Sequence, residues 1–421
     1  MNSNDDIEKS LKIIQASIRR KFTKRKSSSS NKSVMSGISR ESSRSSRSVF
    51  IGDLLTDDEK LKTASKIAKF LKSKLIIDKY TLDNRVYFLQ YIKKNLKEIE
   101  DDDCLEKKRF KDNDGYTIRN ILNLEKLISK DNFNGKIYKT SVKNSLGVFP
   151  IATKVMKTNG SNLFEISLMN KITDDIIMKK LSKHFLIIYR SCLCKKKEQV
   201  SEKSSLISVN EIANGDLASL LQNPEILSNN ELLYNILFQT FISIATFHNL
   251  LSKVHNDCHG GNFLWHYNDE KGYYHYIFNG TNIYLKACKY NIMIYDFGLV
   301  EEINKNTSMK IIKDYCEIIP TFLNENYDSD ENEYSPNIDF TSEMNNIMTL
   351  LMNVVKTIKK NGSPSSPSSP SSPKQKMQVD IFTILFENVF KKHGGNILKT
   401  EVNKSMKIIN SNPYYINNIL V

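Results

Sequence analysis

Cysteine is scarce in this chain of 421 residues and follows no recognisable pattern. Its six cysteines form no CxxC pair and show no spacing typical of a disulfide framework or a zinc site. The first residues also lack the apolar core of a secretory signal peptide. We therefore predict free thiols in a reducing compartment. Cys192 and Cys194 with His184 do not complete a four-ligand set, so a metal site there is the less favoured interpretation.

The composition is not extreme in any respect. Hydrophobic residues make up 40% and charged residues 26%, which excludes a wholly disordered, collagen-like or multi-span membrane protein. One uncharged run, Leu232–Ser252, is long enough to cross a bilayer. Because Asn235, Gln239 and His248 interrupt its apolar character, we predict a buried helix at the centre of a large domain and no membrane span.

Acidic residues are fewer than basic ones, and the excess lies mainly at the N-terminus. The chain has 61 Lys and Arg against 47 Asp and Glu, a net charge of +14. Residues 1–49 hold 12 of the basic residues and 4 of the acidic ones. Residues 27–48 are rich in serine and offer almost nothing apolar to bury, so this basic arm is predicted to be largely disordered and able to contact a polyanion. A pattern resembling the one that calmodulin-like proteins bind is also present at Ile14, Gln15, Arg19 and Lys24, although a solvated arm explains the same residues.

The order of apolar patterns predicts an α+β protein. Apolar residues recur every three and four positions between Ile51 and Ile99, which is typical of helices. Short runs rich in Ile, Val, Phe and Tyr then predict strands, interrupted by a helix at Leu163–Ile172. Later segments are helical, with two polar linkers, one acidic at 324–339 and one with SSP repeats at 361–376. The predicted parts are an arm (1–49), a helical extension (50–117), a strand-rich part (118–213) and a helical part (214–421).

Two sequence segments carry recognisable chemistry. Val254–Phe263 reads VHNDCHGGNF and fits HxDxxxxN, with Asp257 and Asn262 in the polar positions. Asn291–Leu299 reads NIMIYDFGL and contains the DFG motif, which begins at Asp296. With an uncharged helix before the first motif and an apolar strand before the second, the sequence resembles the protein-kinase superfamily. It is most similar to divergent serine/threonine-protein kinases of large cytoplasmic DNA viruses.

This resemblance implies a two-lobed protein-kinase-like fold with a strand-rich N-lobe and a helical C-lobe. It also implies ATP and Mg²⁺ as cofactors, a protein substrate phosphorylated on serine or threonine, and a cytoplasmic location, with the virion possible for a viral protein. Asp257 is then the catalytic base that orients the acceptor hydroxyl. Asn262 and Asp296 are the metal ligands, because hard oxygen ligands suit Mg²⁺.

The nucleotide-binding residues follow from the same resemblance. In PIATKVM, Lys154 contacts the phosphates and, because a buried lysine needs a carboxylate, pairs with Glu165. Lys157, an alternative to Lys154, lies on the opposite face of the strand. SVNEIANGDL resembles the hinge that pairs with adenine, and SKDNFNGKIY the loop that covers the phosphates. The predicted contacts in these two segments are Glu211, Ile212 and Ala213, then Gly135 and Ile137.

Several departures from the kinase pattern leave other functions open. Only Gly135 remains of the usual GxGxxG, Asn256 stands in place of the HRD arginine, and His259 stands where serine/threonine kinases usually have lysine. No APE follows DFG, and Asp314 is expected to open the helix that braces the catalytic loop. The short segment after DFG favours a small-molecule kinase of the aminoglycoside or choline type as one alternative. The loss of the other usual glycines from the phosphate-covering loop favours a pseudokinase scaffold as another alternative.

Overall fold

The computed structural model of the chain describes residues 81–110, 113–128, 135–143, 151–195, 205–304, 306–323, 342–362 and 381–417. All of these belong to one unit, Lys79–Val421, and that unit alone is described below. The predicted arm, the first part of the predicted helical extension, the acidic linker and most of the SSP linker lie outside the described residues. The described chain is a mixed α+β protein, as the sequence predicted.

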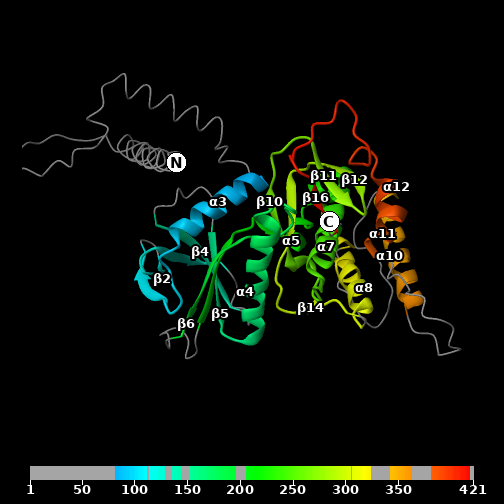
Figure 1. The fold of residues 1–421 in the computed structure, drawn as a ribbon. Coiled ribbons are helices and arrows are strands. Elements are labelled where there is room, and N and C mark those ends of the chain that lie inside the picture. Colours follow the sequence, from blue (N-terminus) through cyan, green and yellow to red (C-terminus); the bar gives the residue numbers. More distant parts are fainter. Residues whose placement is uncertain are drawn as a thin grey trace, which may run out of the picture. The chain divides into compact units, whose positions relative to one another are not determined.

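A curled antiparallel sheet of seven strands forms the first part of this unit (Figure 1). Neighbouring strands follow the order β1-β2-β3-β4-β5-β7-β6. Every residue of β7 is buried, including the polar Asn210 and the charged Glu211 at its end. The strands are β1 (Glu106–Arg109), β2 (Asp114–Ile118), β3 (Leu122–Leu127), β4 (Lys136–Val142), β5 (Ile151–Lys157), β6 (Ile188–Cys194) and β7 (Ser205–Glu211).

Two helices pack beside this sheet. Helix α3 (Leu82–Asn95) begins after Thr81, whose hydroxyl accepts a hydrogen bond from the Asn84 N–H at 3.1 Å. Helix α4 (Gly160–Ile172) begins in the same way after Asn159 and continues into a π-helical segment, η2 (Thr173–Ile177). The predicted helices in these two regions are therefore confirmed.

The boundary predicted at residue 118 is wrong for the sheet, which begins earlier. Strands β1 and β2 occupy part of the segment 50–117, for which only helices were expected. The sequence of β1 is EKKR, and three of its four residues are exposed at the edge of the sheet. A charged edge strand has no apolar alternation, so its sequence carries no strand signal.

Helices dominate the second part of the unit, and α7 (Asn230–Leu251) runs through its centre (Figure 1). Almost all of α7 is buried, as predicted for this uncharged run. Some of its polar side chains bond within the core, since Gln239 donates to Asn235 Oδ1 and to the Tyr290 carbonyl. In the described part of the chain, no helix has the length and apolarity needed to span a membrane. The other helices are α5 (Leu217–Leu220), α6 (Pro224–Leu227), α8 (Ser308–Glu317), α9 (Ile319–Leu323), α10 (Ser342–Gly362), α11 (Ile381–Leu385) and α12 (Lys391–His393), with a π-helical segment, η4 (Phe386–Phe390), between the last two.

Small sheets lie among these helices. Strand β10 (Phe263–Tyr267) pairs with β8 (Gly215–Asp216) and β13 (Tyr290–Ile294), while β9 (Lys253–Val254) pairs with β14 (Glu301–Glu302). A four-stranded sheet joins the hairpin β11–β12 to two short strands near the C-terminus. This corrects the prediction of a helical part up to residue 421, because the last described helix ends at His393. The four strands are β11 (Tyr273–Phe278), β12 (Thr281–Lys286), β15 (Leu398–Lys399) and β16 (Tyr414–Tyr415).

The prediction that all cysteines are free is also wrong, because Cys104 and Cys194 form a disulfide. The segment after α3 runs along β6, where the Asp102 N–H donates to the Leu193 carbonyl at 2.9 Å. This contact places Cys104 beside Cys194, with 4.9 Å between their Cα atoms. The two cysteines are 90 residues apart, so no local spacing in the sequence indicated that they pair. The four free cysteines are Cys192, Cys258, Cys288 and Cys316.

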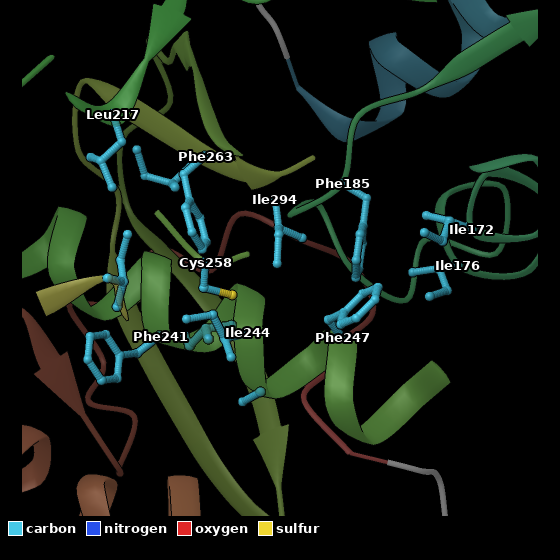
Figure 2. Close-up of a cluster of buried hydrophobic side chains, with 14 of the residues drawn as sticks. Ile172, Ile176, Phe185, Leu217, Phe241, Ile244, Phe247, Cys258, Phe263 and Ile294 are labelled. Atoms are coloured by element: carbon cyan, nitrogen blue, oxygen red, sulfur yellow. The ribbon is translucent and has the colours of Figure 1, made fainter. Parts of the chain in front are cut away.

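An aromatic cluster ties the last helices to α7. The ring of Phe238 lies 4.9 Å from that of Phe390 and 6.3 Å from those of Phe382 and Phe386. The Tyr234 hydroxyl donates to the Phe390 carbonyl at 2.6 Å. The core continues toward the DFG region, where Figure 2 shows side chains of α7 beside Cys258, Phe263 and Ile294.

Truncation of Phe238 tests this packing. Phe238→Ala is expected to lower the free energy of unfolding by about 3–5 kcal/mol, the usual cost of removing a buried aromatic ring. Leu350→Ala is the control, because Leu350 is an exposed apolar residue on α10. Chemical denaturation of both variants measures the difference. Equal stability of Phe238→Ala and wild type would contradict the packing of segment 381–390 on α7.

Candidate active site

Antiparallel pairing of β10 with β13 brings the two sequence motifs together. Phe263 lies opposite Ile294, and the Tyr295 N–H donates to the Asn262 carbonyl at 2.9 Å. Asn262 is the last residue before β10, and Asp296 follows β13. The predicted metal ligands Asn262 and Asp296 are therefore held at the same end of this strand pair.

Asn262 is also bonded to the predicted base. Its Nδ2 donates to both the backbone carbonyl and the Oδ2 of Asp257, each at 2.8 Å. Because these bonds use the amide nitrogen, Oδ1 of Asn262 is the side-chain atom suited to a metal ion. The Asp257 side chain is 39% exposed, so it can reach a substrate from solvent.

The backbone on both sides of the site adopts left-handed conformations. Asp296 has φ +61° and Asn256 has φ +66°, in a region where Asp and Asn are better tolerated than most residues. The Gly298 N–H donates to Asp296 Oδ1 at 3.4 Å, and Asn256 Nδ2 donates to the Leu299 carbonyl at 2.9 Å. Asn256, which replaces the arginine of HRD, therefore links the catalytic loop directly to the segment after DFG.

The predicted lysine and glutamate form a buried ion pair. Lys154 Nζ lies 2.9 Å from Glu165 Oε1 and 3.3 Å from Oε2, with the side chains only 7% and 2% exposed. Lys157 is exposed on the other face of β5, as the odd spacing predicted. This pair connects the central strand of the sheet to α4.

The charge of Lys154 is coupled to the DFG region. Burial alone would lower its pKa, but Tyr295, Glu165 and Asp296 outweigh burial and raise it. The ammonium group also lies 5.7 Å from the centroid of the Tyr295 ring. Burial raises the pKa of Glu165, and Lys154 opposes that shift. Lys154 is therefore cationic at neutral pH and close to the predicted metal ligand Asp296.

Asp314 supports the predicted catalytic loop, which contains Asp257, through hydrogen bonds. Its side chain is fully buried and accepts hydrogen bonds from the His255 N–H at 2.7 Å, the Asn256 N–H at 2.8 Å and His248 Nε2 at 2.7 Å. Asp314 braces the loop as expected, but it does not open its helix, because α8 begins at Ser308. The structure thus confirms that Asp314 contacts this loop, and it corrects the predicted position of Asp314 at the start of the helix.

Both glycines of DCHGGN are explained by close contacts. A Cβ on Gly260 would lie 2.3 Å from Thr321 Cγ2, and the Gly260 N–H donates to Thr321 Oγ1 at 3.0 Å. A Cβ on Gly261 would lie 2.9 Å from His259 Cε1. The Gly261 N–H donates to Nδ1 of His259, which places the proton of a neutral imidazole on Nε2. That nitrogen lies 3.7 Å from Asp257 Oδ2.

His255, the histidine of the HxDxxxxN motif, has a structural role. It is fully buried, its Nε2 lies 3.0 Å from the Tyr295 carbonyl, and its ring makes an edge contact with Phe297. Phe297 in turn stacks on Phe247 of α7, with centroids 5.3 Å apart and planes 6° apart. Figure 2 shows the ring of Phe247 beside that of Phe185. The phenylalanine of DFG is thereby anchored on the central helix.

The predicted adenine contacts, Glu211 to Ala213, lie between β7 and β8, and are called the hinge below. The carboxylate of Glu211 is not available to a nucleotide, because it is buried against Arg85, with Arg85 Nη2 2.8 Å from Glu211 Oε2. His266 Nε2 lies 3.0 Å from the carbonyl of Ile212, which is therefore engaged as well. Ala213 is half-buried. Among the described residues, its backbone N–H and carbonyl take part in no hydrogen bond to another backbone group besides those within helices and strands. The predicted backbone contacts of Glu211, Ile212 and Ala213 with adenine therefore stay predictions, and the Glu211 side chain binds Arg85 instead of a nucleotide.

The two predicted residues of the phosphate loop lie next to Lys154. Ile137 is directly opposite Lys154 in the pairing of β4 with β5, so both side chains share one face of the sheet. Gly135 has φ +123°, and a Cβ there would lie 2.6 Å from the Val155 carbonyl. Only glycine fits this position. The loop residues before Gly135 lie outside the described part of the chain.

Sequence reasoning missed several residues that hold the site together. Arg85 bonds the hinge, Glu317 Oε2 accepts from the Cys258 N–H at 3.1 Å, and Ser161 Oγ donates to the Gly298 carbonyl at 2.8 Å. Each contact joins residues more than 50 positions apart, and no local spacing signals such pairs. A lone arginine on the apolar face of α3 was the one available hint.

The predicted metal site is small. Within the described residues, no group of three or more His, Cys, Asp or Glu side chains is arranged to hold a metal ion. Asp296 and Asn262 supply one carboxylate and one amide oxygen, which fits Mg²⁺ only if phosphate oxygens and water complete its six-fold coordination.

No known family model matches the sequence, and no curated protein is significantly similar to it. The assignment of function therefore depends on this chain's own residues.

Replacement of Asp314 tests the support of the catalytic loop. Burial would raise the pKa of Asp314, but hydrogen bonds from His248 and the His255 backbone outweigh it and lower the pKa below the usual 3.8. The charged form therefore stabilises the fold above pH 3.8, and this contribution is lost as the pH falls further. At pH 7, Asp314→Asn is expected to cost about 2–3 kcal/mol of unfolding free energy.

The pH dependence separates this effect from a general loss of packing. The difference between wild type and Asp314→Asn is expected to shrink as the pH falls below 3.8, because the carboxylate then takes up a proton first in the unfolded chain and, at still lower pH, in the folded protein. Asp175→Asn is the control, because Asp175 is exposed on η2 and pairs with Lys179, four positions later. Denaturant titrations between pH 3 and pH 7 measure both. A stability difference independent of pH would contradict the assigned charge.

Proposed function

We propose that the chain is an ATP- and Mg²⁺-dependent protein kinase that phosphorylates serine or threonine, with a two-lobed protein-kinase-like fold. The seven-stranded sheet with α4 is the N-lobe in this proposal, and the region built around α7 is the C-lobe. The observation that carries the proposal is the convergence of five residues from four segments, namely β5, α4, the loop before β10 and the residues after β13. A buried Lys154–Glu165 pair is coupled to Asp296, while Asn262 bonds both Asp257 and the residue before Asp296.

Each of these residues has a role that its surroundings support. Lys154 carries a fixed positive charge beside Asp296, which suits it to hold anionic phosphate oxygens. Asp257 is partly exposed and oriented by Asn262, so it can accept the proton of a hydroxyl group. Such general-base assistance contributes on the order of 10² to 10⁴ in rate. Asp296 and Asn262 are the residues that would hold Mg²⁺, which when bound neutralises charge on the phosphates.

His259 lies close to the predicted base, Asp257. Ordinary serine/threonine kinases have no histidine at this position. Its Nε2 points toward Asp257 Oδ2 from a ring fixed by Gly261. A neutral N–H donor at this position can bond a phosphate oxygen or the acceptor, although without the full charge of a lysine.

Phosphorylation of a small alcohol is the second candidate. After Gly298, only residues 299–307 precede α8, and two of them form β14 against β9. So short a segment offers a peptide little surface to bind. A screen of metabolite alcohols beside basic and acidic proteins separates the two substrate classes.

The base assignment is tested by phosphate transfer. Asp257→Asn is expected to reduce transfer from ATP by about 10²- to 10⁴-fold, because the amide cannot accept the hydroxyl proton. Asp175→Asn makes the same chemical change at an exposed site on η2 and should leave transfer unchanged. Radiolabel incorporation into protein or small-molecule acceptors measures both variants. Equal incorporation by Asp257→Asn and wild type would refute the assigned base.

Nucleotide binding separates an active kinase from a scaffold that binds no nucleotide. ATP with Mg²⁺ at 100 times its dissociation constant should stabilise the wild type by about 2.7 kcal/mol. Asp296→Asn should lose most of this stabilisation because it removes the only carboxylate among the predicted metal ligands. Thermal unfolding with and without ATP and Mg²⁺ gives the result. An unchanged melting temperature of the wild type would support the scaffold instead.

A further inference from the structure

Arg85 is a fully buried charge on α3, before the residues 118–320 that resemble protein kinases. Its Nε and Nη2 donate to Oε1 and Oε2 of Glu211, both at 2.8 Å. This two-point geometry is the strongest arrangement available to an arginine and a carboxylate. Glu211 is the first residue of the hinge, so the bond fixes the point where the chain leaves the large sheet.

The remaining donors of Arg85 reach two other elements of the site. Nη1 donates to the Lys183 carbonyl at 2.9 Å and Nη2 to the Phe185 carbonyl at 2.5 Å. These residues continue the chain from α4, which carries Glu165. Nη2 also lies 3.4 Å from Met293 Sδ on β13, the strand that leads to Asp296. One side chain thus contacts the hinge, the segment between η2 and β6, and β13.

The charge balance explains why this arginine is required. Burial would raise the pKa of Glu211, but Arg85 outweighs burial and lowers it. His266, 4.0 Å from Glu211 Oε1, does not replace Arg85, since burial lowers its own pKa to about 4 and leaves it neutral at pH 7. A buried carboxylate that loses its cation is strongly destabilised. Arg85 is therefore the group that keeps a charged Glu211 in place.

We propose that Arg85 is a positioning residue for nucleotide recognition and that α3 is an integral part of the nucleotide site. This inference rests on the proposed function. Arg85 fixes Glu211, and His266 on β10 fixes Ile212, so the backbone of Ala213 is held between two bonded neighbours. The backbone groups that select adenine are thereby preorganised before a nucleotide arrives.

The test requires a variant that removes the ion pair without leaving a buried charge. Arg85→Met with Glu211→Gln meets this need, because the glutamine is neutral and can still accept the bond that Ile187 N–H gives to Glu211 Oε2. Arg85→Lys is the second variant, since one ammonium group keeps the charge but cannot reproduce the fork of bonds. Lys93→Met is the control on the same helix, where an exposed ion pair joins α3 to Asp174.

The readout is the ratio of the dissociation constants for ATP and GTP, measured by calorimetry with Mg²⁺. The two nucleotides share their phosphates and differ in the base, so a general loss of stability does not change this ratio. We expect wild type and Lys93→Met to prefer ATP. The double variant should lose about tenfold or more of ATP affinity and keep its GTP affinity, because only the preorganised hinge is altered.

The outcomes distinguish this inference from the proposed function. A folded double variant with the wild-type ratio overturns the role of Arg85 and leaves the kinase proposal intact. If the double variant does not fold, Arg85→Lys decides in the same way, with a raised Kd ratio of ATP to GTP supporting the role and an unchanged ratio overturning it. Wild type that binds neither nucleotide overturns the proposed function, and this inference with it.

Discussion

The buried ammonium group of Lys154 imposes the constraint on which the site depends. A lysine that is 7% exposed stays charged only beside a carboxylate, and Glu165 on α4 supplies it. The ion pair therefore fixes α4 against the central strand of the sheet. The same charge is coupled to Tyr295 and Asp296, so it also ties the sheet to the strand that ends at DFG. Loss of either partner would disturb both connections at once.

The loop that carries Asp257 is held by hydrogen bonds from its backbone N–H groups to three side chains. Asp314 accepts two N–H groups of this loop, and Glu317 and Thr321 accept two more from Cys258 and Gly260. All three acceptors come from the short helices α8 and α9, directly after the DFG segment. A loop without regular structure is thereby fixed from one side, which leaves Asp257 free to face solvent on the other.

Local signals predicted the chemistry better than the architecture. The spacing of Asp257 and Asn262 placed both on one loop, and the need of a buried lysine for a carboxylate identified Glu165; both contacts are present. The early edge strand, the Cys104–Cys194 disulfide and the engagement of Glu211 by α3 were missed. These features join distant or exposed residues, and neither periodicity nor spacing encodes such pairs.

The central claim is that Lys154, Asp257, Asn262 and Asp296 surround one nucleotide and its metal ion. A crystal structure of the full chain with a non-hydrolysable ATP analogue and Mg²⁺ tests it most directly. The account predicts the base beside the Ala213 backbone, the phosphates at Lys154, and the metal on the side-chain oxygens of Asp296 and Asn262. A nucleotide bound elsewhere, or a metal that touches neither Asp296 nor Asn262, would contradict it.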